Sequence, residues 1–153
     1  LLYLRPIQEM KKTIERLKAS GERNSNDKDS KFEIISIFIT SISNKEPEKA
    51  RERAAKTLAF YVAVGEYYNR FLSENGFKDE VETITQEYRK NGLESLDRFV
   101  PDKMLESLTI YGNSEQCIKS IKKFMSTGIT MPVLQINPLS GTEDSIREIL
   151  STF

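Results

Sequence analysis

The residues best suited to chemistry gather where an apolar segment turns polar: Tyr67, Tyr68, Asn69 and Arg70 follow soon after Tyr61. Tyrosine rings offer flat apolar faces with a polar tip, and the arginine fork binds carboxylates and phosphates. With an amide beside them, these side chains can stack on and hold a flat, anionic ligand. The alternative is a packed helix end whose polar tips reach solvent. The sequence leaves both interpretations open.

Several common catalytic arrangements are missing. The chain has no histidine and a single cysteine, Cys117, which argues against a zinc site and excludes an internal disulfide. Without histidine the commonest general base is also absent. The segment GNSEQC, residues 112–117, lacks the lysine and the glycine pattern of a P-loop, so nucleotide hydrolysis has no support. The lone cysteine, expected on a buried stripe, fits a reduced, cytoplasmic setting.

Charge and length limit the partners. The 23 basic residues balance the 23 acidic ones, whereas a nucleic-acid surface usually shows a strong positive excess. No apolar run reaches the roughly 18 residues of a membrane span. We therefore expect neither nucleic acid nor membrane as a partner. The lysines that stand close together are expected on solvated helix faces rather than at phosphate sites: Lys11, Lys12, Lys119, Lys122 and Lys123.

Two segments have the composition of strands. FEIISIFITSI, residues 32–42, is almost continuously apolar, as in strands buried on both faces of a parallel sheet. MPVLQINP, residues 131–138, predicts a short strand over about 131–137 between prolines. The helices around them predict an α/β architecture in which parallel strands are joined by helical crossovers. Two parallel strands make no stable sheet alone, and the chain opens on Leu1, so we expect a piece of a larger fold.

Local signals place the helices. Proline suits a first turn and glycine a C-terminal cap, so Pro6 begins a helix that is expected to end near Ser20-Gly21. Asn113 and Gln116 have the spacing of a capping box, which begins a helix that Gly128 closes. The remaining predicted helices span 47–72 with a bend near Gly65, then 78–91, 92–99, 102–108 and 142–153.

Two stretches carry a family resemblance: EPEKARERAAKTLAFYVAVGEYYNRFLSENGF, residues 46–77, and VPDKMLESLTIYGNSEQCIKSIKKFMSTGITMPVLQINP, residues 100–138. An alanine-rich helix leads to a tyrosine-containing turn and Gly-Phe, and then come Val-Pro-Asp, a Gly-x-x-Glu helix start and a final strand. This order resembles the C-terminal half of the bacterial luciferase-like family. It is most similar to the branch of methylenetetrahydromethanopterin reductase, and the match covers most of residues 32–153.

The resemblance implies a C-terminal fragment of a TIM (β/α)8 barrel, with residues 1–153 as one partial domain. Residues 32–42 and 131–138 would be the last two strands, and the family's helical insertion would fall between them, over about 47–128. Such barrels bind FMN or the deazaflavin coenzyme F420 and transfer a hydride to or from a small-molecule substrate, or activate oxygen. The family's first six strands, which carry most flavin contacts, are absent from these residues. The fragment alone is therefore expected to be inactive and to retain no cofactor.

In such a barrel, chemistry sits at the C-terminal ends of the strands. This placement makes Thr40, Ser41 and Asn137 candidates for the substrate or cofactor pocket, beside Tyr61, Tyr67, Tyr68, Asn69 and Arg70. The alternative is that Thr40 and Ser41 only end a strand and that Asn137 starts a turn before Pro138.

The apolar run Leu58–Val64 needs cover on several sides. The resemblance places it between the barrel wall and the insertion, or against a partner subunit. A two-strand remnant would also expose strand edges, so we expect a homo-oligomer. The side chains expected to be bare are Ile35, Ile37, Phe38, Ile39, Val133 and Leu134. A different class of function stays possible from the sequence: a stand-alone helical interaction module without cofactor.

Overall fold

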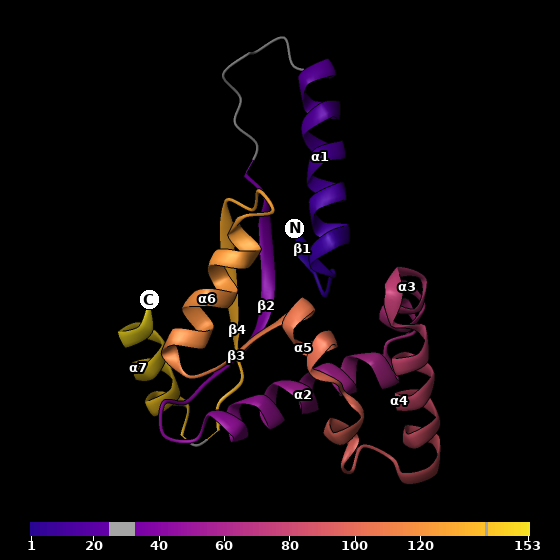
Figure 1. The fold of residues 1–153 in the computed structure, drawn as a ribbon, viewed down its shortest axis with the longest axis vertical. Coiled ribbons are helices and arrows are strands. Elements are labelled where there is room, and N and C mark those ends of the chain that lie inside the picture. Colours follow the sequence, from indigo (N-terminus) through magenta and orange to yellow (C-terminus); the bar gives the residue numbers. More distant parts are fainter. Residues whose placement is uncertain (25–32, 140) are drawn as a thin grey trace.

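The computed structural model describes residues 1–24, 33–139 and 141–153. Helices outnumber strands and lie around one small sheet (Figure 1). In chain order the elements are β1 (Leu2–Tyr3), α1 (Ile7–Asn24), β2 (Ile35–Ile42), α2 (Pro47–Val64), α3 (Glu66–Leu72), a kink (Ser73–Phe77) with non-helical backbone at Asn75 and Gly76, α4 (Lys78–Asn91), a 3-10 helix (Leu96–Phe99), α5 (Asp102–Leu108), β3 (Thr109–Gly112), α6 (Ser114–Met125), β4 (Met131–Ile136) and α7 (Thr142–Thr152).

Strand β2 is the centre of the sheet, and every strand pair is parallel. On one edge β2 pairs with β4, from Ile35 opposite Met131 to Thr40 opposite Ile136. On the other edge β1 pairs with the first half of β2, and β3 pairs with its second half, starting at Ile39. The two predicted strands are therefore confirmed as parallel neighbours joined through helices.

The structure corrects the prediction of only two strands. Strand β3 interrupts the range 47–128 that the sequence predicts as helical, and β1 precedes the first helix. Both are too short to show a period in the sequence, and pairing with β2 decides their conformation. Strand β2 begins at Ile35; Phe32, where the strand was predicted to start, lies outside the described residues. Helix α1 continues to Asn24, beyond its predicted end at Ser20-Gly21.

The sheet has a packed layer on each face. On one face α1, α6 and α7 bury an apolar cluster in which the rings of Phe38 and Phe124 lie 4.3 Å apart. On the other face α2, α4 and α5 form a second cluster with Ile39, Leu58 and Leu105. Helix α2 crosses the end of the sheet where β2 stops (Figure 1). It thereby covers the strand ends at which a site was predicted.

The apolar run in α2 is not buried all round. Leu58 and Val62 are fully buried, whereas Phe60 is 44% exposed and Val64 43% exposed. The helix ends at Val64 and resumes as α3 at Glu66, so the predicted bend near Gly65 is confirmed. A Cβ at Gly65 would lie 2.7 Å from the Tyr61 carbonyl oxygen, which leaves room only for glycine.

The expectation that six strand side chains stand bare is wrong in part. Phe38 is 2% exposed and Ile39 0%, because the two helical layers cover them. Ile35, Ile37 and Leu134 are half-buried, and Val133 is 37% exposed. Exposure is therefore concentrated along β4. Among the described residues, no helix is both long and apolar enough to cross a membrane.

Candidate functional site

The predicted residues at the strand ends come together. The Asn137 amide N–H donates to the Thr40 carbonyl oxygen at 2.8 Å, and the Ser41 hydroxyl donates to the Asn137 carbonyl oxygen at 3.0 Å. All three residues are buried. The Thr40 hydroxyl donates to the carbonyl oxygen of Phe38, within its own strand. Ser41 and Thr40 therefore hold the end of β2 against β4, and Asn137 directs its side chain to α2.

A hydrogen-bond chain joins α2 to the end of β4. Arg53 Nη1 donates to Thr57 Oγ1 at 2.9 Å, and the Thr57 hydroxyl donates to Asn137 Oδ1 at 2.8 Å. Asn137 Nδ2 in turn donates to the Gln135 carbonyl oxygen, and Arg53 Nε donates to the Pro138 carbonyl oxygen at 3.2 Å. Each of these groups has its orientation set by the next, so the arginine fork is held in place at the strand end.

A cleft of about 390 Å³ opens beside this chain. Its lining comes from α2, from the segment before and within the 3-10 helix, and from the end of β4: Arg53, Lys56, Thr57, Phe60, Tyr61, Leu93, Leu96 and Asn137. Two of these side chains are cationic and none is acidic. Four other clefts in the described part of the chain each include at least one carboxylate. This cleft, which we call the α2 cleft, therefore favours anionic groups.

Tyr61 belongs both to the α2 cleft and to an aromatic cluster. Its ring makes edge-to-face contacts with Tyr3 and Tyr68, at centroid distances of 5.4 and 5.7 Å. The Tyr3 hydroxyl donates to Gln135 Oε1 at 2.6 Å, and burial raises the pKa of Tyr3 well above its ordinary value. The three rings are packed against one another, so Tyr3 and Tyr68 brace Tyr61 where it lines the cleft.

The rest of the predicted tyrosine group lies elsewhere. Asn69 Nδ2 donates to Thr85 Oγ1 at 2.8 Å and to the Val62 carbonyl oxygen at 3.3 Å, so this side chain ties α3 to α4 and α2. Tyr67 is 56% exposed and stacks on Phe71. Arg70 is exposed on α3. Of the predicted group, only Tyr61 lines the α2 cleft, because the bend at Gly65 redirects the chain.

Sequence reasoning missed the cleft residues Arg53, Lys56, Thr57 and Phe60. They carry a signal, since positions 53, 56, 57 and 60 have the three- and four-residue spacing that places side chains on one helix face. What the spacing cannot show is that this face meets Asn137. Leu93, which is 51% exposed, and Leu96 come from a segment with no periodic pattern.

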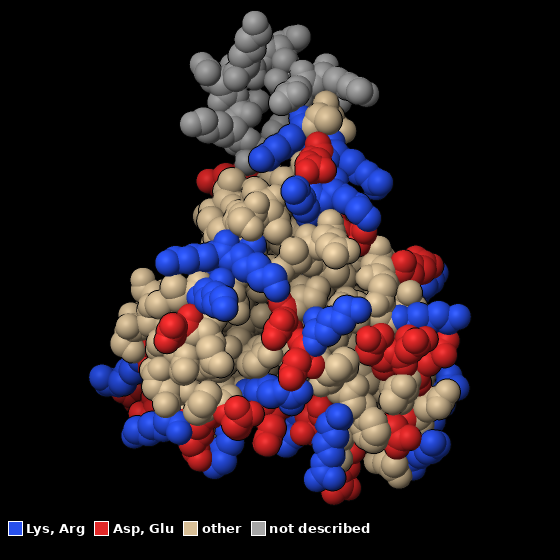
Figure 2. Space-filling model, viewed as in Figure 1, with Lys and Arg blue, Asp and Glu red and all other residues tan. Residues whose placement is uncertain are grey.

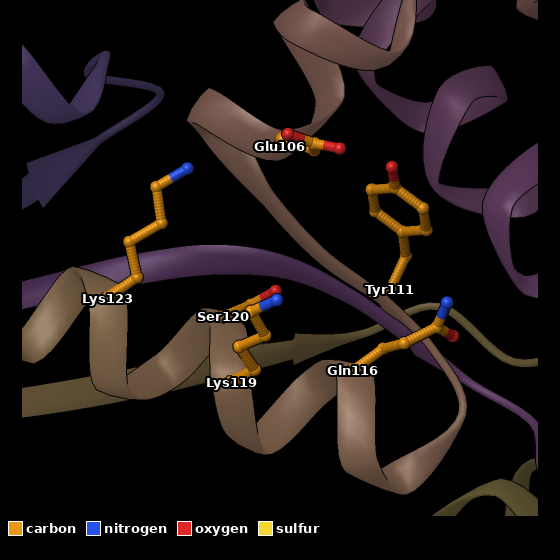
Figure 3. A pocket seen from close by; sticks show the side chains of 6 residues that line it. All are labelled: Glu106, Tyr111, Gln116, Lys119, Ser120 and Lys123. Atoms are coloured by element: carbon orange, nitrogen blue, oxygen red, sulfur yellow. The ribbon is translucent and has the colours of Figure 1, made fainter.

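The lysines of α6 are exposed, as predicted. Figure 3 shows two of them, Lys119 and Lys123, beside a separate cleft of about 240 Å³, between α6, α5 and β3. Glu106 enters this cleft from α5, and burial raises the pKa of Tyr111 there. Over the lower part of the face drawn in Figure 2, basic and acidic side chains are interleaved.

In the part of the chain that the structure describes, no group of three potential metal ligands among Asp, Glu, Cys and His occurs. Cys117 is fully buried in the core, as predicted, and burial raises the pKa of its thiol to about 12.

Comparisons with known proteins bear on the fold and the family. None of the curated proteins compared with the chain matches it in sequence. The structure is similar to that of the coenzyme F420-dependent tetrahydromethanopterin reductase from Methanopyrus kandleri, with a TM-score of 0.76 at 17% sequence identity. The match covers 96% of this chain but only 42% of the reductase, so the chain has the fold of part of that protein.

This likeness confirms the predicted fold class: a mostly helical α/β structure with parallel strands, similar to part of a TIM-barrel reductase. The model of one protein family, described as luciferase-like monooxygenase, matches residues 1–131. That range is most of the chain and includes all of α2, which supplies five of the eight residues that line the cleft. The chain belongs to the luciferase-like monooxygenase family.

Proposed function

We propose that the whole protein to which this chain belongs is an oxidoreductase that transfers a hydride or activates oxygen through FMN or coenzyme F420. The family match and the similarity in fold to an F420-dependent reductase support an oxidoreductase. The observation that carries the proposal is the α2 cleft, which lies at the C-terminal end of β4, where barrel enzymes hold their reacting groups.

The cleft residues fit a flat cofactor that bears negative charge. Phe60 and Tyr61 present aromatic surface, while Arg53 and Lys56 supply positive charge. A volume of about 390 Å³ falls within the usual range for small-molecule sites. When bound, a flavin or deazaflavin supplies the hydride-transfer chemistry, and the protein orients it.

The chain's own residues have three tasks in this proposal. Tyr61, braced by Tyr3 and Tyr68, gives the site a rigid wall. The Thr57–Asn137 hydrogen bond holds that wall against the strand end. Phe60 and the leucines of the cleft exclude water from the reacting face, which strengthens electrostatic contacts inside the site.

We further propose that the 153 residues hold only part of the cofactor site. The chain spans 42% of the reductase that it resembles, so the remaining contacts would come from other parts of the protein. In isolation the chain would then bind either cofactor weakly and would turn over no substrate.

The proposal can be tested with the whole protein as the cell makes it. FMN and F420 are titrated separately, and binding is followed by the change in cofactor fluorescence. We expect one of them to bind, and its absorbance to bleach when a reducing substrate is supplied. Phe60→Ala is expected to weaken this binding about three- to tenfold through the lost aromatic contact.

Phe99→Ala is the matched control, because Phe99 is similarly exposed, at 37% against 44%, but lines a different cleft. Its affinity should equal that of the unaltered protein. Failure of the whole protein to bind either cofactor would refute the proposal and would favour a helical interaction module without cofactor.

A further inference from the structure

The α2 cleft has two chemically different ends along one helix face. Arg53 and Phe60 are seven positions apart in α2, which corresponds to about 10 Å along the helix axis. Arg53, with Thr57 and Asn137, forms the polar end at the tip of β4. Phe60 and Leu93, both about half exposed, form the apolar end.

The polar end is organised before any ligand arrives. Two hydrogen bonds hold the Arg53 guanidinium, one to Thr57 Oγ1 and one to the Pro138 carbonyl oxygen. A guanidinium has five N–H donors, so these two bonds leave others for a ligand. Neither Arg53 nor Lys56 forms an ion pair with any acid in residues 1–24, 33–139 and 141–153. Both charges therefore remain available to an incoming anion.

We infer that Arg53 and Lys56 bind the phosphate or carboxylate of a ligand whose flat apolar body lies against Phe60 and Leu93. This inference rests on the proposed function for the location of the ligand, and it adds the ligand's class and orientation. The planar fork of Arg53 matches the oxygens of a phosphate or carboxylate, whereas Lys56 acts as a more mobile point charge. A ligand without an anionic group forfeits both contacts.

The test measures binding, not turnover, and uses the whole protein. Phenyl phosphate is compared with phenol, which has the same ring without the anionic group, by titration calorimetry. FMN is compared with riboflavin, which lacks the phosphate, by fluorescence. The two pairs distinguish the sources of the anion: a preference within the first pair assigns a small substrate, and a preference within the second assigns the cofactor phosphate.

Arg53→Gln is expected to weaken binding of the preferred anion about tenfold or more, because a charged hydrogen-bonding partner is lost. Lys56→Gln is expected to weaken it about two- to fivefold, in line with an exposed charge. Lys49→Gln is the matched control, since Lys49 is an exposed cation on the same helix that lines another cleft. It should leave the affinity unchanged.

Arg53 also supports the fold, so circular dichroism of each variant establishes that it is folded at the titration temperature. If Arg53→Gln is unfolded, Lys56→Gln decides, because Lys56 is exposed and forms no ion pair within the described ranges. The inference would be overturned if phenyl phosphate bound no more tightly than phenol and FMN bound no more tightly than riboflavin. Equal weakening by Lys49→Gln would overturn it too.

The two proposals can fail separately. If the whole protein binds phenyl phosphate through Arg53 but binds neither FMN nor F420, the anion-binding inference stands and the proposed oxidoreductase function is refuted. If cofactor binding and turnover are unchanged in both Arg53→Gln and Lys56→Gln, the proposed oxidoreductase function stands and the anion-binding inference is refuted.

Discussion

The Thr57 hydroxyl donates a hydrogen bond to Asn137 Oδ1 at 2.8 Å, although the two residues are 80 positions apart in the chain. This contact joins the middle of α2 to the end of β4, and both residues line the α2 cleft. Asn137 is buried, with 6% of its surface exposed, so its amide oxygen depends on this donor. The contact therefore serves both the fold and the site.

Removing that donor should destabilise the protein. Thr57→Val keeps the shape of the side chain but leaves the Asn137 oxygen buried without a partner, which costs about 1–3 kcal/mol. The free energy of unfolding, measured by urea denaturation, is expected to fall by that amount. Thr83→Val is the control, because the Thr83 hydroxyl bonds to its own exposed helix, and a change within about 0.5 kcal/mol is expected. An equal decrease in the free energy of unfolding in both variants would show that the Thr57–Asn137 hydrogen bond stabilises the protein no more than the Thr83 one.

Core and cleft phenylalanines should behave differently. Phe38 is 2% exposed and packs against Phe124, so Phe38→Ala is expected to lower the free energy of unfolding by about 3–5 kcal/mol. Phe60→Ala removes a side chain that is 44% exposed and is expected to cost about 1 kcal/mol. Urea denaturation of both variants measures the difference. A larger loss in Phe60→Ala would assign Phe60 to the core instead of the cleft.

The first turn of α6 depends on its capping box. The Asn113 side chain accepts from the Gln116 backbone N–H, and the Gln116 side chain accepts from the Asn113 backbone N–H. Asn113→Ala is expected to destabilise the protein by about 1 kcal/mol, and Asn113→Gly by a few tenths. Thermal unfolding resolves this order. Asn91→Ala, at the exposed end of α4, is the control, and a drop as large as that of Asn113→Ala would contradict a specific cap.

The Cys117 thiol should be unreactive while the chain is folded. Burial raises its pKa to about 12 from an ordinary value of 9.0, and Glu148 repels the thiolate as well. At pH 8 the folded protein should therefore react with a disulfide reagent far more slowly than the urea-unfolded chain, and the rate should rise together with unfolding. Fast labelling of the native protein would show that the core around Cys117 opens to the reagent.

The raised pKa of Cys117 also makes the free energy of unfolding depend on pH. Above about pH 9 the unfolded thiol loses its proton while the folded one keeps it, so the unfolded state binds fewer protons. The free energy of unfolding should fall as the pH rises from about 9 towards 12. Cys117→Ala should flatten this slope in urea denaturation measured across pH. An unchanged slope would assign the pH dependence to other groups.

We also propose that the chain self-associates through β4. In the described ranges β4 pairs only with β2, and Met131 and Val133 on it are 43% and 37% exposed. An apolar strand with an open edge is a site for pairing with another chain. Sedimentation velocity at micromolar concentration should show an average mass above 17.6 kDa that falls in Val133→Lys. Thr83→Lys on the exposed face of α4 is the control. A monomer at every concentration tested would exclude this contact.

Elements with local signals were determined by the sequence itself. Helix α4 spans Lys78–Asn91 and α5 spans Asp102–Leu108, both as predicted, because turn residues and a proline border them. The strands β2 and β4 follow from their dense apolar composition. The parallel arrangement follows because helices must connect them. These features depend on neighbours within a few positions, which a sequence shows directly.

The remaining strands and the site were decided only by tertiary structure. The four residues of β3 and the two of β1 are strands because β2 offers them hydrogen-bonding partners. Tyr67 and Arg70 lie only six and nine positions after Tyr61 in the sequence, yet the bend at Gly65 places them outside the cleft that Tyr61 lines.

Contacts across long sequence separations built the candidate site. Thr57 meets Asn137 over 80 positions, and Tyr3 meets Gln135 over 132. A residue's type shows which bonds it is able to form, but the packing of α2 across the strand ends decides which partner it reaches. The sequence therefore determined the kinds of groups available, and the fold decided that Arg53, Lys56 and Tyr61 share one cleft with Asn137.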